Sequence, residues 1–429
     1  MTRNEIPIFF RVIRAVIFVA LLALLVIAAI PYGTVEPWWK AAFVCAVFGI
    51  CILSIGDGGS LEFLNGSILV PMLALSALAF VQTIAFGSEQ VAGVTIRNTI
   101  SADPFQTRFF ALQMLALTAW LALLYRYVNT EQRVRVLVYT ILAVAVVSAV
   151  FGILRQATQQ QTGFVLPLLR QNQGYGQFIN KNHFAYLMEM AFGLGIGVAL
   201  MKRERLLIYL ALLLPIWTAL VLSNSRGGIL AMLVQFVSAA LLLSSRGLTA
   251  LRVVLLVVLV AGVLLGAFWV GGDRLASNFE NASSELSSGD RAGVSRNEIW
   301  RATLKMFGAH PVTGAGLGGY WIGITAYHDA SGLMTPQEAH NDYLELLSSG
   351  GLIGFAIGVW FAVSVIRAAR ANLTIDTGYM RALRFGAVIG IIGVAAHSLV
   401  DFGLHILINA IIFLSLIMIA TVTSPQKGT

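Results

Sequence analysis

The chain has 429 residues, of which 58% are hydrophobic and only 11% are charged. A soluble domain needs more charge on its surface, so this composition excludes an ordinary soluble protein and predicts a polytopic membrane protein. The formal net charge is +8, but the basic residues fall mostly in short loops between apolar runs. That distribution follows the positive-inside rule and gives no reason to expect nucleic acid as a partner.

In chain order, runs of about 20 apolar residues recur, each long enough to cross a hydrocarbon core of about 30 Å. They predict an all-α fold with about twelve transmembrane helices. The predicted spans cover approximately residues 9–30, a run that begins at 38, 68–86, 109–127, 136–154, 182–201, 206–222, 227–243, 253–270, 344–364, 385–400 and 404–419.

The basic residues also set the predicted orientation. They flank the first and last spans on the side that the positive-inside rule makes cytoplasmic, so both termini are expected there. Residues 1–270 then contain nine spans and residues 344–429 contain three. Between them, residues 271–343 are expected to form a periplasmic loop with short helices. Chemistry in an outward loop has no access to ATP or nucleotide sugars, so it requires a substrate that is already activated on the lipid side.

Some basic residues are predicted to face outward, where short loops seldom carry them. Arg226 is the most informative, because it lies in a tight turn between two apolar spans, where desolvation of a charge is costly. Its guanidinium group either snorkels to a headgroup phosphate or binds a substrate diphosphate through two parallel hydrogen bonds. The outward set is Arg97, Arg108, Arg155, Arg170, Lys181, Arg226, Arg274, Arg291, Arg296, Arg301 and Lys305.

Two polar stretches precede the sixth predicted span. Arg170 is followed by Gln171-Asn172-Gln173-Gly174, and Asn180 is followed by Lys181-Asn182-His183. The amide groups of these stretches suit recognition of a sugar. The alternative is a polar loop that caps the span through Asn180 or Asn182.

A helical spacing runs through Arg291, Arg296, Trp300 and Arg301 in the large loop. Arg296 and Trp300 are four residues apart, so one face of this helix is expected to present a cation beside an aromatic ring.

His340 lies where the large loop meets the tenth predicted span, next to Asn341 and Asp342. A neutral imidazole there can take a proton from a sugar hydroxyl, which predicts a catalytic base. Asp342 is expected to orient His340 or a neighbouring arginine. A loop histidine is more often merely polar than catalytic, but the outward basic residues favour the catalytic interpretation. The two glycines at 350 and 351 are expected to lie inside the helix that follows.

His397, Asp401 and His405 follow a spacing of i, i+4, i+8 at the end of the eleventh span. An acid at this depth is costly, so Asp401 indicates a functional site or a buried ion pair. Zinc is the alternative, but an HExxH motif and a cysteine ligand are both absent from the sequence, so neither a metal nor a cofactor is expected.

Five motifs occur in a fixed order over about residues 172–410. They are Asn180-x-Asn182, Ser225-Arg226-Gly227-Gly228, His310-Pro311-x-x-Gly314-x-Gly316-x-Gly318, His340-Asn341-Asp342-Tyr343-Leu344 with Gly351-Leu352-Ile353-Gly354, and Ser398-Leu399-Val400-Asp401-Phe402 with Leu404-His405. In this order and spacing the sequence resembles the bacterial O-antigen ligase and O-antigen polymerase superfamily of integral membrane glycosyltransferases.

This resemblance implies a GT-C-like fold in the bacterial inner membrane with a periplasmic active site. It implies inverting, metal-independent transfer of a glycan from undecaprenyl diphosphate to a hydroxyl of another glycan or of the lipid A core. His340 would be the base, and Arg226 with an arginine of the large loop, best Arg296, would hold the diphosphate. The residues expected to contact substrate are Arg226, Arg296, Arg291, Arg170, Asn180, Asn182, Asp342 and Asp401. Membrane lipids complete the expected partners.

The acceptor stays open among a lipid A core, another lipid-linked repeat and a protein hydroxyl, because its choice lies in the shape of the loops. A transporter, such as a flippase for lipid-linked oligosaccharides, is the alternative class of function. A flippase should line its membrane interior with cations along a path. Here the cations gather at the outer surface and the mid-span residues are mostly apolar, so the sequence favours the enzyme.

Overall fold

The computed structural model describes residues 8–57, 64–91, 94–158, 174–201, 206–244, 296–328, 335–375 and 378–423. Within these residues, seven helices are long and apolar enough to cross a membrane, and four shorter apolar helices accompany them. The predicted span at 253–270, and with it the number twelve, lies outside the described residues, as does the loop from 271 to 295. The expectation of a helical membrane protein is confirmed.

The helix bounds follow the apolar runs closely. The seven long helices are α1 (Ile8–Ala29), α2 (Pro37–Ile55), α4 (Pro104–Tyr127), α5 (Glu131–Ala157), α6 (Lys181–Met201), α12 (Asp342–Ile375) and α13 (Gly378–His397). The four shorter helices are α3 (Gly66–Gln82), α7 (Leu206–Leu222), α8 (Arg226–Ser244) and α14 (Leu407–Thr421).

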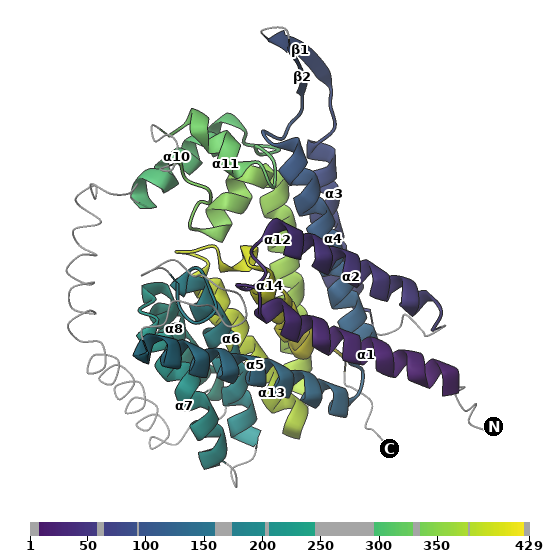
Figure 1. Cartoon of the computed structure of the whole chain (residues 1–429), viewed down its shortest axis with the longest axis vertical. Coiled ribbons are helices and arrows are strands. Elements are labelled where there is room, and N and C mark those ends of the chain that lie inside the picture. Colours follow the sequence, from purple (N-terminus) through teal and green to yellow (C-terminus); the bar gives the residue numbers. More distant parts are fainter. Residues whose placement is uncertain are drawn as a thin grey trace.

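A β-hairpin interrupts the helical pattern and was not predicted. The third span was expected to continue to residue 86, but α3 ends at Gln82, and strand β1 (Gly87–Val91) then pairs antiparallel with β2 (Val94–Asn98). The hairpin projects beyond the end of the helices near α3 (Figure 1). The prediction of an all-α fold is therefore wrong at this point, where a polar stretch of alternating residues follows the apolar run.

Helices α6 and α13 form the tightest contact of the bundle, and glycine makes it possible. A Cβ atom on Gly193 would lie 2.5 Å from the backbone nitrogen of Gly390, and one on Gly197 would lie 2.4 Å from the carbonyl oxygen of Ala382. Small residues at facing positions let membrane helices approach to backbone contact. This contact fixes the ends of α6 and α13 side by side, where the candidate site forms.

Helix α12 is broken near its beginning rather than continuous. Gly351 has φ 63° and ψ −167°, a conformation that essentially only glycine adopts. The break exposes backbone groups that pair with the glycine-rich strip after α10: the Leu352 amide donates to the Pro311 carbonyl at 2.8 Å. Gly314, at φ 70°, packs so closely that an added Cβ would lie 2.3 Å from the carbonyl oxygen of Ser349. Gly350 and Gly351 lie inside α12, as expected, but Gly351 interrupts the helical conformation there.

Three short elements complete the described part of the loop above the bundle. They are α10 (Arg296–Ala309) and α11 (Tyr320–Gly323), followed by a 3-10 turn, η2 (Ile324–Ala326), and they lie over one end of the bundle (Figure 1). Trp300 donates its indole N–H to the carbonyl of Ala339 at 3.0 Å. Thr303 and Tyr320 share a hydrogen bond of 2.7 Å between their hydroxyl groups. The predicted aromatic platform on α10 instead holds the chain immediately before His340.

Candidate active site

Asp401 is the centre of the candidate site. Helix α13 ends at His397, and the turn that follows buries Asp401 completely, at 0% exposure. Its carboxylate accepts a close hydrogen bond from the side-chain amide of Asn182 and another, of 2.9 Å, from the backbone N–H of Phe402. A buried carboxylate must be hydrogen-bonded or paired. These two contacts satisfy part of that requirement, and basic side chains satisfy the rest.

Three basic side chains converge on Asp401 from different parts of the chain. Arg296 Nη2 lies 3.6 Å from Oδ2, His340 Nδ1 lies 3.8 Å from Oδ1, and His183 Nε2 lies 4.0 Å from Oδ1. Burial alone would raise the pKa of Asp401, but His340 and the other nearby histidines lower it well below its usual range. The group is therefore a carboxylate and attracts the guanidinium group of Arg296.

His340 has an unusual backbone. Its φ is 50°, in the left-handed region that residues other than glycine seldom adopt. Such a conformation costs about 1–3 kcal/mol and persists only where surrounding contacts enforce it. The ring packs edge-on against Phe402, with centroids 4.9 Å apart, and remains 33% exposed. With Nδ1 near Asp401, Nε2 is the ring nitrogen left for a substrate.

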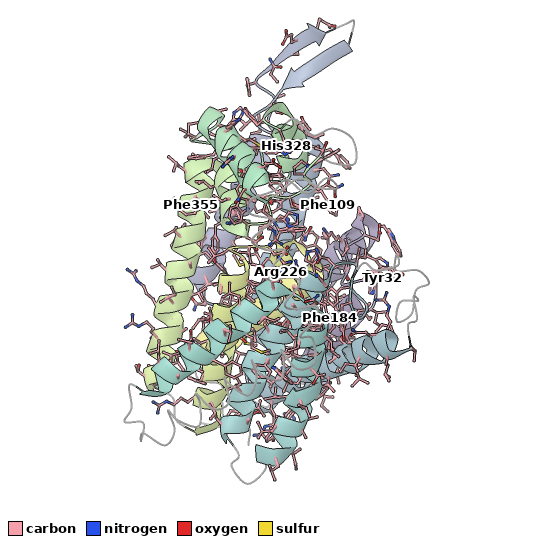
Figure 2. The ribbon with its side chains drawn as sticks, turned by 90° about the vertical axis from the view of Figure 1, so that its left-hand side faces the viewer. Tyr32, Phe109, Phe184, Arg226, His328 and Phe355 are labelled. Atoms are coloured by element: carbon pink, nitrogen blue, oxygen red, sulfur yellow. The ribbon has the colours of Figure 1, made fainter. Side chains whose placement is uncertain are left out.

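Arg226 is the first residue of α8, and the residue before it, Ser225, is linked to the Asp401 carboxylate through Asn182. Ser225 accepts a hydrogen bond from the Gly228 amide at 3.1 Å, which caps α8, and donates to the side-chain oxygen of Asn182 at 2.8 Å. Asn182 in turn donates to Asp401. Figure 2 shows Arg226 near mid-height, where α8 meets the C-terminal segment. The Ser-Arg-Gly-Gly motif thus sets an arginine at the edge of the Asp401 site.

The close approach of α8 to α13 requires Gly227. A Cβ atom at this position would lie 2.4 Å from Nε2 of His397. His397 itself is buried, pairs with Glu189 at 3.0 Å and stacks on Tyr186 with ring centroids 4.1 Å apart. Glu189 was not predicted, although an acid within an apolar span is a signal that could have identified it.

Of the predicted substrate residues, the structure brings together Arg296, Asn182 and Asp401 around His340, with Arg226 connected through Ser225. For Asn180 it shows the capping alternative, because its side chain accepts from the backbone N–H of Asn182 at 2.8 Å. Arg170 and Arg291 lie outside the described residues. His183 was missed as a neighbour of the site, although it directly follows Asn182 in the sequence.

The expectation that Asp342 orients His340 is wrong. Among the contacts of the described residues, Asp342 pairs with His405, at 3.6 Å, and not with His340. His397, Asp401 and His405, which follow a spacing of i, i+4, i+8 in the sequence, do not lie on one continuous helix, because α13 stops at His397 and each residue has different partners. His405 lies on a 3-10 turn, η4 (Gly403–His405), which directs it toward carboxylates on another side.

His405 is surrounded by three carboxylates. Its Nδ1 lies 3.3 Å from Glu338, and its Nε2 lies 3.5 Å from Glu345 and 3.6 Å from Asp342. Burial would lower the pKa of His405, but these carboxylates raise it to about 10. Ligand atoms of Glu338, Glu345 and His405 lie within 4.8 Å of one another, close enough to hold a metal ion. Such an ion would compete with the imidazole proton, and the absence of a metal requirement stays a prediction.

One family model matches the chain. Residues 209–359 match the model described as O-antigen ligase. The matched stretch runs from α7 into α12 and includes Arg226, Arg296 and His340, while Asn182 and Asp401 lie on either side of it. No curated protein matches the sequence.

Proposed function

Through residues 209–359 the chain belongs to the O-antigen ligase family, and on this basis we propose that it transfers a glycan from a lipid diphosphate to an acceptor hydroxyl. Membership in this family supports a role in polysaccharide assembly. The observation that carries the specific reaction is the pairing of His340 with the buried Asp401 carboxylate, at 3.8 Å, beside arginines that begin two helices.

In this proposal His340 is the general base. Nε2 accepts the proton of the acceptor hydroxyl as its oxygen attacks the anomeric carbon of the donor sugar. The imidazolium that forms is stabilised by Asp401, which faces Nδ1 and stays ionised. The two atoms are beyond hydrogen-bond distance in the described state, and catalytic hydrogen bonds commonly shorten when substrate binds.

Arg226 and Arg296 are proposed to bind the leaving group. As the new glycosidic bond forms, the bond between the anomeric carbon and the diphosphate oxygen breaks, and the diphosphate leaves with the electron pair. Preorganised cations stabilise the charge that develops there. Both residues begin helices, α8 and α10, whose amino-terminal ends also favour an anion. Arg296 is 48% exposed, so its guanidinium group is accessible to a ligand.

The cellular setting follows the same proposal. The donor is undecaprenyl-diphosphate-linked glycan at the periplasmic face of a bacterial inner membrane, and the acceptor is a lipid A core or a second lipid-linked glycan. These two acceptors distinguish a ligase from a repeat-unit polymerase. The orientation rests on the positive-inside rule.

The test is transfer by purified protein in lipid vesicles supplied with a lipid-diphosphate glycan and each candidate acceptor, with and without a chelator. Wild type should form product in both conditions, and His340→Gln should reduce the rate roughly 10²–10⁴-fold, as expected for loss of a general base. His310→Gln is the matched control, because His310 is an exposed histidine of the same loop. Full activity of His340→Gln would refute the base, and flipping of the donor without any product would support a transporter.

A further inference from the structure

A cavity of about 400 Å³ lies beside the candidate site and is distinct from it. Its described lining comes from α2, α4, α11, α12, η4 and the segments that join them, and includes neither His340 nor the two arginines. Phe402 connects the two regions, because its ring centroid lies 4.9 Å from that of His340 and 5.9 Å from that of His405, which lines the cavity. The ring of Phe402 thus lies between the cavity and the proposed base.

The polar part of the lining is formed by His405 and the three carboxylates around it. Among the described residues, neither carboxylate oxygen of Asp342 has a hydrogen-bond partner. The hydroxyl of Ser349, a lining residue that is only 3% exposed, has none either. Buried polar atoms without partners are costly and therefore rare. A ligand that carries several hydroxyl groups would satisfy them.

Aromatic side chains form much of the remaining lining. Phe109 and Phe110 come from α4, and Trp321 comes from α11. Along α4 the cavity extends from Gln106 to Leu117, a rise of roughly 16 Å at 1.5 Å per residue. Figure 2 shows Phe109 above the level of Arg226, toward the hairpin end. Aromatic walls with a few convergent polar groups are typical of small-ligand sites, and they suit a sugar ring, which has apolar faces and a polar edge.

The charges of the cavity differ from those of the arginine side. No arginine occurs among the described lining residues, and its basic groups are Lys40 and His405. Three acidic side chains face these two groups, and His405 is already paired with all three. A diphosphate requires cations that are not neutralised in this way. The cavity therefore favours an uncharged ligand.

We infer that this cavity binds the terminal sugar of the acceptor, in uncharged form, beside the base that deprotonates its hydroxyl. The inference rests on the proposed function and assigns the donor and the acceptor to two neighbouring regions. The lipid diphosphate occupies the side of Arg226 and Arg296, and the acceptor sugar occupies the side of Glu338, Asp342 and Glu345. Residues of α4 and η4 then determine which acceptor binds, and not which donor binds.

Phe109→Ala tests the aromatic wall, and Phe105→Ala is its matched control. Both phenylalanines lie on α4, but Phe105 is 75% exposed and does not line the cavity. With the acceptor oligosaccharide that wild type extends, and with donor at saturation, Phe109→Ala should raise the acceptor KM roughly tenfold, equivalent to about 1.4 kcal/mol of binding. The donor KM should stay within about twofold of wild type, which also shows that the variant is folded.

The charge preference is tested with wild type alone. An acceptor whose terminal hexose is oxidised at C6 to the uronic acid should show a KM roughly tenfold above that of its neutral parent. An unchanged acceptor KM in Phe109→Ala, or equal KM values for the neutral and acidic acceptors, would overturn the inference while transfer itself continues. Failure of wild type to transfer any glycan would instead refute the proposed function, so the two failures are distinguishable.

Discussion

The Nδ1 atom of His340 lies 3.8 Å from the Oδ1 atom of Asp401, although α12 and α13 separate the two residues in the chain. The pair forms because the unusual backbone of His340 and the turn after α13 direct both side chains to one point. A buried carboxylate beside an imidazole orients the ring and stabilises the imidazolium that forms when it accepts a proton.

Asp401→Asn should therefore lower activity with little change in fold. Asparagine keeps the size of the side chain but removes the charge that stabilises the imidazolium, and we expect kcat to fall roughly 10²–10⁴-fold. Because Asp401 acts through His340, the double variant with His340→Gln should be no slower than His340→Gln alone. Additive losses, measured as initial rates in vesicles, would show that the two residues act independently.

Arg226→Lys tests whether a guanidinium fork is required. Lysine keeps the positive charge but cannot make two parallel hydrogen bonds to a phosphate. We expect the donor KM to rise roughly tenfold while the acceptor KM stays the same. Arg301→Lys, an exposed arginine on α10, is the control and should change neither value. An unchanged donor KM in Arg226→Lys would argue against bidentate binding.

Sequence reasoning placed most of the described helices because apolar length alone determines what can cross a membrane. It also listed Asn182, Arg296 and Asp401 together with His340 as candidate site residues. It could not foresee that Asp342 turns to His405 instead. The partner of Asp342 depends on the direction of the chain after α13, and no local pattern in the sequence indicates that direction.

The break in α12 could not be predicted from the sequence either. The neighbours of Gly351 in the sequence are apolar and helix-compatible and do not indicate a break, which forms where the backbone of the strip after α10 pairs with α12. The backbone conformation of Gly351 depends on the position of this strip, which is distant in the chain.

Gly351→Ala should destabilise the protein more than Gly350→Ala. At Gly351, φ is 63°, and an added Cβ would lie 2.3 Å from the carbonyl oxygen of Val312, so alanine is both strained and too close to the backbone. The expected cost is about 1–3 kcal/mol from the backbone conformation. The nearest atom to a Cβ on Gly350 is a leucine methyl at 3.2 Å, which can shift. Equal melting temperatures of the two variants in detergent would contradict this account.

The positive charge of His405 is expected to stabilise the fold. Its pKa, about 10, lies above the ordinary value of 6.5, so the charged form stabilises the fold. This stabilisation is complete below about pH 6.5 and is lost as the pH rises through about 10. Facing it, burial would raise the pKa of Glu338, but His405 and other neighbours lower it to about 2, so this partner stays ionised throughout. Asp342, Glu345 and Lys40 are the other titratable groups around it.

His405→Gln should accordingly have a lower melting temperature than wild type at pH 7, and the difference should shrink as the pH approaches 10. Glutamine keeps a hydrogen-bonding side chain but removes the cation that lies among Glu338, Asp342 and Glu345, which is destabilising. His310→Gln, at an exposed position, should show no such trend. Thermal unfolding in detergent across this pH range measures both variants. A difference that is constant with pH would mean that packing of the ring, and not its charge, accounts for the effect.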